Sequence, residues 1–403
     1  MTKKSHRVLL FLILFGTMLL VGYNENIKGV SYPLIKTELG ITYEQQGVMV
    51  SSFSLCFVLS CLIGGIVIGS FGVRKTFVAG FATMLAGIIG IVIPPILNLP
   101  GFVSLIALFV VVSSFGVLEV GTNALAAQLF TTKAALLLSF LHFFYGAGSI
   151  LSPRVAGAIA TVLNWRSIYL FSIPMVMLFL IPTTFCRFPQ EDSSAQTIGG
   201  VKKVKFVTAL KNPMVWIFSI TLGIMVAVEV SSSNWAGLYF QDVYHMDPKK
   251  AGAAFISNYY ILFTASRLVS GFAVEKLGYL RSLFIATLAT IFILVLGFAF
   301  GAKGIYILPV LGFFTAVYWP TILATAIGYF KHDAPVMSSA IIVISGAVNC
   351  VIQFLIGLTN RVTGPAWGYR SCLVYAIMIV VSLVILTNCM KRPYIKTFKG
   401  AAQ

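Results

Sequence analysis

The stretch FVVVSSFGVLEVGTNALAAQL, residues 109–129, is apolar enough to cross a lipid bilayer, yet it carries a carboxylate near its middle. Glu119 lies there, and Asn123 follows one helical turn later. An acid at the bilayer centre is costly unless it faces the interior of a helix bundle or a water-filled cavity. We therefore expect the other apolar segments to surround Glu119, and we expect Glu119 to have a function.

The composition is that of an integral membrane protein, whose first partner is the lipid bilayer. Of the 403 residues, 59% are apolar and 10% are charged, against about a quarter charged in soluble domains. The formal net charge of +17 would suggest a nucleic-acid partner in a soluble protein. In a membrane protein, basic residues collect in the short loops that set the topology, so we expect no nucleic-acid partner.

The apolar runs predict an all-α protein with twelve transmembrane helices, because each run has the roughly twenty residues that a spanning helix needs. A polar stretch, 187–211, divides them into two halves of six, residues 1–186 and 212–403. The runs fall at about 8–34, 46–70, 76–97, 101–129, 134–162, 167–186, 212–238, 251–273, 281–300, 303–330, 336–360 and 367–390.

The basic residues predict the orientation. Most of the 28 Lys and Arg residues fall in segments on the same side as the N-terminus, including Arg74, Lys75 and the central stretch. Cytoplasmic loops carry such an excess. We therefore expect both termini to be cytoplasmic and the protein to lie in the plasma membrane, the inner membrane of a bacterium. The basic N-terminus lacks a small-residue cleavage site, so we interpret the first run as a retained helix.

The two halves repeat one another. GITYEQQG (40–47) precedes the second run as HMDPKKAG (245–252) precedes the eighth. GIVIGSFGVRK (65–75) follows the second run as GFAVEKLGYLR (271–281) follows the eighth. Two parallel repeats joined by a loop are typical of transporters whose binding site lies at the bilayer midplane between the halves.

The repeated loops resemble the glycine-and-basic signature of the major facilitator superfamily, with Glu275 in the usual acidic position and Ser70 replacing it in the first half. Within that superfamily the chain is similar to the fucose–galactose–glucose:proton symporter family. The stretches that carry this similarity are LEVGTNALAAQL (118–129), LHFFYGAGSILSP (141–153), VEVSSSNWAGLYF (228–240) and YWPTILATAIGYF (318–330). The resemblance implies the major facilitator fold, alternating access and proton symport.

The resemblance also implies roles for residues of the first half. Glu119 falls where the family keeps a glutamate that participates in proton coupling, and Asn123 beside it is a candidate for solute binding. A neutral Glu119 bonded to Asn123 for structure alone is the alternative. His142 and Tyr145 fall where the family touches sugar hydroxyls, and they lie a turn apart on one face. Here they replace amide side chains, so the solute can differ from the family's sugars.

Glu25 and Lys28 lie three residues apart in the first run, close enough to pair on a helix. The family's symporters carry an aspartate near this place, at the position of Gly29. A buried ion pair is weak evidence for stability, because desolvation offsets the attraction. We interpret the pair as part of the solute site or of a gate, with a structural tether as the alternative.

Aromatic and amide side chains of the second half suit a polyol, because rings cover apolar sugar faces while amides bond hydroxyls. Glu229, like Glu25 in the first half, is a further candidate for proton coupling. Tryptophan also occurs at membrane interfaces without any ligand. The candidates for solute binding are Asn234, Trp235, Trp319, Asn349 and Gln353.

Three arginines are candidates for gating or structure. Arg154 follows Pro153 within the fifth run, where it needs an acid, an anionic substrate or a route to the outer surface. This stretch resembles, weakly, the glycine–proline signature of drug:proton antiporters. Arg267 near the inner end of the eighth run is expected to contact the loop of Glu275, and Arg74 belongs to the first repeated loop.

The sequence thus predicts a secondary transporter that moves a small polar solute, a sugar or a related compound, together with protons. A proton-coupled exporter of drugs or amphiphiles is the alternative. A channel is disfavoured because no ring of like charge or filter loop is visible, and an enzyme because no catalytic spacing is visible. The six cysteines show no zinc spacing. We expect no cofactor, no metal site and a monomer.

Overall fold

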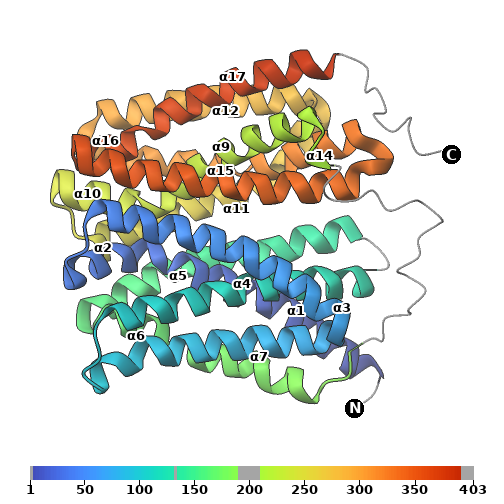
Figure 1. Cartoon of the computed structure of the whole chain (residues 1–403), viewed down its shortest axis with the longest axis vertical. Coiled ribbons are helices and arrows are strands. Elements are labelled where there is room, and N and C mark those ends of the chain that lie inside the picture. The colour runs from blue at the N-terminus through green and yellow to red at the C-terminus, as the bar shows by residue number, and fades with distance from the viewer. Residues whose placement is uncertain (1–2, 131–133, 189–208, 392–403) are drawn as a thin grey trace.

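The computed structural model describes residues 3–130, 134–188 and 209–391. Within these ranges the chain is helical and contains no strand. The helices form two bundles that lie side by side, one from the N-terminal and one from the C-terminal half of the chain (Figure 1).

The N-terminal bundle begins with a crossing that is broken at Ile27 and ends with one broken near Ser172. Its second and third apolar runs are joined into the single helix α3, which turns at Gly72, where φ is +78°. Only glycine adopts such a backbone without strain. The elements are α1 (Lys3–Asn26), α2 (Lys28–Leu39), α3 (Tyr43–Ile96), α4 (Phe102–Leu129), α5 (Ala134–Val162), α6 (Trp165–Leu170) and α7 (Ile173–Phe185).

The C-terminal bundle repeats this plan with more interruptions. Its fourth crossing begins in short 3₁₀ turns and is interrupted before Tyr318. The elements are α9 (Pro213–Asn234), α10 (Ala236–Tyr244), η2 (Pro248–Gly252), α11 (Ala253–Leu277), α12 (Tyr279–Ala299), η3 (Gly301–Tyr306), η4 (Leu308–Val310), α13 (Leu311–Thr315), α14 (Tyr318–Phe330), η5 (Lys331–Asp333), α15 (Ala334–Thr363), α16 (Pro365–Arg370) and α17 (Cys372–Met390).

The fold has the expected twelve membrane helices in two halves. Among the described residues, nine helical stretches are long and apolar enough to cross a membrane. One of them, α3, has 54 residues and reverses at Gly72, so it supplies two crossings. The 29 residues of α5 and the 25 of α11 supply the remaining ones. Of the predicted central segment 187–211, residues 189–208 lie outside the described residues, as do most of the C-terminal tail and the first two residues.

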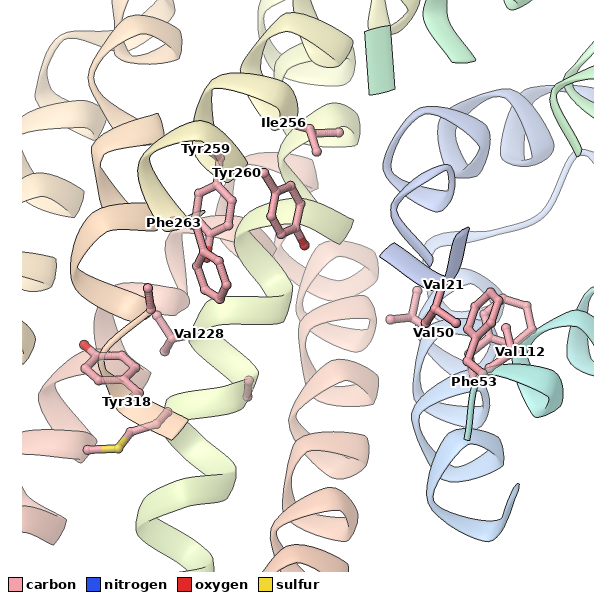
Figure 2. Packing of buried hydrophobic residues seen from close by; sticks show 14 of the residues in the cluster. Val21, Val50, Phe53, Val112, Val228, Ile256, Tyr259, Tyr260, Phe263 and Tyr318 are labelled. Atoms are coloured by element: carbon pink, nitrogen blue, oxygen red, sulfur yellow. The ribbon is translucent and has the colours of Figure 1, made fainter. Parts of the chain in front are cut away.

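Each bundle has its own packed apolar interior. Figure 2 shows Val21, Val50, Phe53 and Val112 gathered in the N-terminal bundle, with Tyr259, Phe263 and Tyr318 in the C-terminal one. Many large apolar side chains outside these interiors are exposed on the protein surface, such as Phe185 and Phe272. In a membrane these exposed side chains face lipid, so they do not require a protein partner.

The two bundles touch along α3 with α15 and along α5 with α11. Glycine makes both contacts close. A methyl group on Gly47 or Gly357 would collide with the backbone of the other, and one on Gly157 would collide with the carbonyl oxygen of Lys249. Contacts of α2 with α10 and of α5 with η2 add to them, at the end of the molecule opposite to that where α1 begins (Figure 1).

The helix map makes a testable prediction on sidedness. In a variant without the native cysteines, single cysteines at Lys250 and Lys303 should react with a membrane-impermeant maleimide added to intact cells. Cysteines at Lys276 and Lys331 should react only after the cells are permeabilised, because their helix ends lie on the side with excess basic loops. Labelling from the opposite side at any of these four exposed positions would contradict the predicted orientation.

Candidate functional site

A cavity of about 560 Å³ lies between the two bundles. Helices α1 to α5 supply its N-terminal wall, and α9, α11, α12 and α14 supply its C-terminal wall. It thus occupies the place that the sequence repeat predicts for a binding site. The predicted residues that line it are Glu25, Lys28, Glu119, His142, Tyr145, Glu229, Arg267, Glu275 and Trp319.

The cavity extends toward the end of the molecule where α1 begins. Along α11, Ser257 donates its hydroxyl to the carbonyl oxygen of Ile150, and Thr264 packs against Gly146. The next residues of α11 contribute to the cavity wall as far as Glu275. The bundles are therefore closed against one another at the α2–α10 end and separated at the other end.

Asp242 of α10 joins the bundles at the closed end. Its Oδ2 lies 3.4 Å from the Nζ of Lys36 on α2 and accepts a hydrogen bond of 2.5 Å from the hydroxyl of Tyr43 on α3. Lys36 also lies over the ring of Tyr43, 4.2 Å from its centroid. Glu44 and Arg361 form a second ion pair between the bundles.

The break between α1 and α2 places Glu25 and Lys28 at the cavity. The Nζ of Lys28 lies 3.5 Å from Oε1 of Glu25, and the hydroxyl of Tyr145 donates to Oε2 at 2.8 Å. Asn26 donates to the hydroxyl of Ser149 at 2.9 Å and so ties α1 to α5. Gly22 permits this close approach, because a methyl group there would collide with the carbonyl oxygen of Tyr145.

Glu119 faces the cavity from α4. Its Oε1 accepts a hydrogen bond of 3.3 Å from Asn123, which is exposed and does not line the cavity. Among the described residues Glu119 forms no ion pair. Three residues earlier on the same helix, Gly116 packs tightly on α3 around Ser60.

The C-terminal wall is more aromatic. Glu229 of α9 and Arg267 of α11 line it, together with Trp319 at the start of α14. The guanidinium of Arg267 lies 4.5 Å from the ring centroid of Phe263, a cation–π distance. Its Nε is buried without a hydrogen-bond partner in the described part of the chain. Arg267 and Glu275 both line the cavity and form no ion pair with one another.

The other predicted residues lie outside the cavity. Trp235 donates its indole N–H to Gln353 at 2.8 Å, and Gln353 donates to Asn349 at 3.1 Å. Asn349 in turn donates to Ser54 of α3 at 3.2 Å. This buried chain of polar groups ties α9 and α15 to the N-terminal bundle. Asn234 is buried beside it, with its Oδ1 unpaired.

The arginines Arg154 and Arg74 also lie outside the cavity. Arg154 on α5 donates to Oδ1 of Asn258 on α11 at 3.2 Å, so it crosses between the bundles on an exposed face. Arg74 donates to the carbonyl oxygen of Thr184 at the end of α7. The gating or structural roles of Arg154 and Arg74 stay predictions.

Sequence reasoning did not single out Tyr260, Phe263 and Ser233, which also line the cavity. A signal was available for the first two. Tyr260, Phe263 and Arg267 repeat at the three- and four-residue spacing of one helix face. An aromatic stripe that ends in an intramembrane arginine indicates a face turned to a cavity rather than to lipid.

The Glu25–Lys28 contact gives a prediction on stability. Breaking a buried ion pair costs about 3–5 kcal/mol, but these side chains are 28% and 20% exposed. We therefore expect Glu25→Gln to destabilise the purified protein by about 1–3 kcal/mol. The double variant Glu25→Gln with Lys28→Met should recover the loss, as measured by the melting temperature in detergent.

Tyr145→Phe serves as its control, because it removes the 2.8 Å hydrogen bond and leaves both charges in place. It should cost about 1 kcal/mol. A Glu25→Gln protein as stable as the wild type would contradict the pairing. A folded double variant that does not transport would assign the pair to the solute site.

The Asp242 contacts give a prediction on closure. Asp242→Asn removes the ion pair with Lys36 at constant size and should weaken the closed end by about 1 kcal/mol. A cysteine at Ser233 in the cavity should then react several-fold faster with an impermeant maleimide added from the outside. Asp247→Asn, which keeps an oxygen to cap η2 at the same end, should leave the rate unchanged. Equal rates in both variants would show that Asp242 does not hold the bundles together.

Residues 14–352 match the family model of the Major Facilitator Superfamily. Among solved structures, the fold is similar to that of a D-xylose–proton symporter, with a TM-score of 0.76 and 15% identity over 94% of this chain and 97% of that chain. It is also similar to a variant of the E. coli fucose:proton symporter, with a TM-score of 0.63 and 14% identity over 95% of this chain and 98% of that chain.

A curated relative, a probable sulfoacetate transporter of Cupriavidus necator, is 25% identical over 179 residues. This match covers 42% of the chain and 38% of the relative, so the chain spans less than half of that relative's length in the alignment. The family match, in contrast, extends from α1 to α15. The chain is a transporter and belongs to the Major Facilitator Superfamily.

Proposed function

We propose that the chain is a proton-coupled symporter that moves a small polar solute, a sugar or a related compound, across the plasma membrane by alternating access. The observation that carries this proposal is Glu119, a carboxyl on the wall of the inter-bundle cavity without an ion-pair partner among the described residues. A carboxyl in such a place can take up a proton on one side of the membrane and release it on the other.

The geometry supports a coupling between proton and solute. Glu119 shares its cavity with Glu25 and Glu229, so acids from both bundles face the volume in which a solute would lie. His142, Tyr145 and Tyr260 offer hydrogen-bonding groups on the same walls. The solved structures similar in fold include symporters named for fucose and for xylose, which supports proton symport as the mode of transport.

The asymmetric contacts of the bundles support alternating access. One end is closed by Asp242 and by close glycine contacts, whereas the cavity extends toward the other end as far as Glu275. We place that second end in the cytoplasm, with both termini, from the excess of basic residues there. The structure then corresponds to an inward-facing state of a monomeric transporter.

The second candidate is a proton-coupled exporter of drugs or amphiphiles. The apolar part of the lining favours it, since Met18, Val21, Phe57 and Trp319 face the cavity beside the acids. Overexpression should raise resistance to a panel of amphiphilic toxins if this function holds, whereas the proposed function predicts uptake of labelled polar solutes and unchanged resistance.

The test of the proposed function is Glu119→Gln, which mimics the protonated acid and cannot release a proton. The variant should exchange solute in counterflow at a rate similar to the wild type, yet lose accumulation driven by a pH gradient. In the wild type, a gradient of about one pH unit supports up to about ten-fold accumulation of a neutral solute carried with one proton. Both assays are performed with the same proteoliposomes.

Glu229→Gln is the matched variant, since Glu229 lines the same cavity from the other bundle. If Glu119→Gln still accumulates solute while Glu229→Gln does not, the proton is carried by Glu229. If folded Glu119→Gln fails in both assays, Glu119 binds the solute directly, and its role as a proton carrier is contradicted.

A further inference from the structure

Arg267 is a cation of the cavity that has no acid within ion-pair distance among the described residues. Lys28, the other basic residue on its walls apart from His142, lies 3.5 Å from Glu25. In the described part of the chain the Nε of Arg267 is buried without a hydrogen-bond partner, and its guanidinium lies 4.5 Å from the ring centroid of Phe263. We propose that the transported solute carries an anionic group, such as a carboxylate or a sulfonate, and that Arg267 binds this group.

The inference rests on the proposed function, and on the fact that a carboxyl can lose its charge by protonation whereas a guanidinium cannot. A carboxyl in a poorly hydrated place can take up a proton and become neutral, whereas a guanidinium stays charged at every working pH. Four acids share the cavity with Arg267, and they can carry protons. The acids are Glu25, Glu119, Glu229 and Glu275.

None of these four acids forms an ion pair with Arg267. Two of them have other hydrogen-bond partners. Glu25 accepts from Tyr145 and lies beside Lys28, and Glu119 accepts from Asn123. Neither Glu229 nor Glu275 comes within ion-pair distance of Arg267. When protons load these carboxyls, Arg267 remains as a positive charge without a counter-ion. A solute anion supplies the counter-ion that the protein lacks.

The position of Arg267 links its charge to the movement that closes the inner end of the cavity. It lies one helical turn beyond Thr264, which packs on Gly146 of the other bundle, and the cavity wall of α11 continues from Arg267 to Glu275. Closing the inner end would bring the N-terminal bundle over Arg267 and remove water from it. Burying an unpaired guanidinium is costly, so a bound anion favours the closed form and links solute binding to the conformational change.

Guanidinium chemistry fits the proposed ligand. Its planar N–H groups pair with the two oxygens of a carboxylate or sulfonate through parallel hydrogen bonds. Stacking on Phe263 holds the plane of the guanidinium in place. Hydroxyl groups on the rest of the solute would meet Tyr260, Ser233 and His142, which line the same cavity.

The test uses pairs of compounds of equal chain length in which a carboxylate replaces one terminal hydroxymethyl group. Aldonates of three to six carbons, with gluconate as the longest, are compared with polyols of the same chain lengths, with sorbitol as the longest. Binding is measured as a rise in the melting temperature of the full chain in detergent, and transport as pH-driven accumulation in proteoliposomes. We expect at least one aldonate to bind and to accumulate, and its matched polyol to do neither.

Arg267→Gln should weaken binding of that aldonate by about 10- to 100-fold, because it removes a charge-assisted hydrogen bond. Arg267→Lys keeps the charge without the planar donors, and it should fall between Arg267→Gln and the wild type. Lys303→Gln removes the same charge from an exposed position outside the cavity and should bind as the wild type does. If Arg267→Gln does not fold, Arg267→Lys carries the comparison.

The outcomes separate this inference from the proposed function. Equal binding and pH-driven accumulation of aldonates and polyols, or aldonate binding that is unchanged in Arg267→Gln or Arg267→Lys, would overturn the role of Arg267 and leave proton symport intact. Aldonate transport that depends on Arg267 but not on the pH gradient would overturn proton coupling and leave the anion site intact. Binding of neither class would contradict the anion site.

Discussion

The cost of holding charge away from water governs how this molecule is built. Charged side chains of the cavity reduce that cost in different ways. Glu25 and Lys28 lie together beside the hydroxyl of Tyr145, Glu119 can take a proton while it bonds Asn123, and Arg267 rests on an aromatic ring. Under the proposed function the acids accept protons, which lowers the cost of holding several charges in one cavity. The same uptake and release of protons would then provide the coupling to transport.

The cavity depends equally on where the bundles meet. On α11, Ser257 and Thr264 contact α5, whereas Tyr260, Phe263 and Arg267 line the cavity. The residues that make the contact and the residues that line the cavity therefore lie on one helix. A rigid-body rotation of the bundles that widens the closed end would narrow the other end, so α11 transmits the change directly to the residues at the cavity wall.

Much of this structure could be predicted from the sequence, because apolar length and buried charge leave strong signals. The run around Glu119 showed a helix that needs a cavity, and the spacing of Glu25 and Lys28 showed their proximity. Trp235, Asn349 and Gln353 were expected at the solute site, but they bond to one another outside the cavity. Helix spacing shows which residues share a face, but the partner of that face depends on how helices from distant segments pack. The joining of two runs into α3 was also not visible, because a glycine kink and a loop have similar sequences.

The backbones of the two bundles meet closely at three glycines, where Gly47 of α3 touches Gly357 of α15 and Gly157 of α5 lies against the carbonyl oxygen of Lys249 in η2. At these points no glycine side chain interlocks across the interface. Separating them exposes little apolar side-chain area, so the hydrophobic contribution that opposes separation is small. The two bundles can therefore separate at these glycines without a large hydrophobic cost, while each bundle keeps its own packed interior.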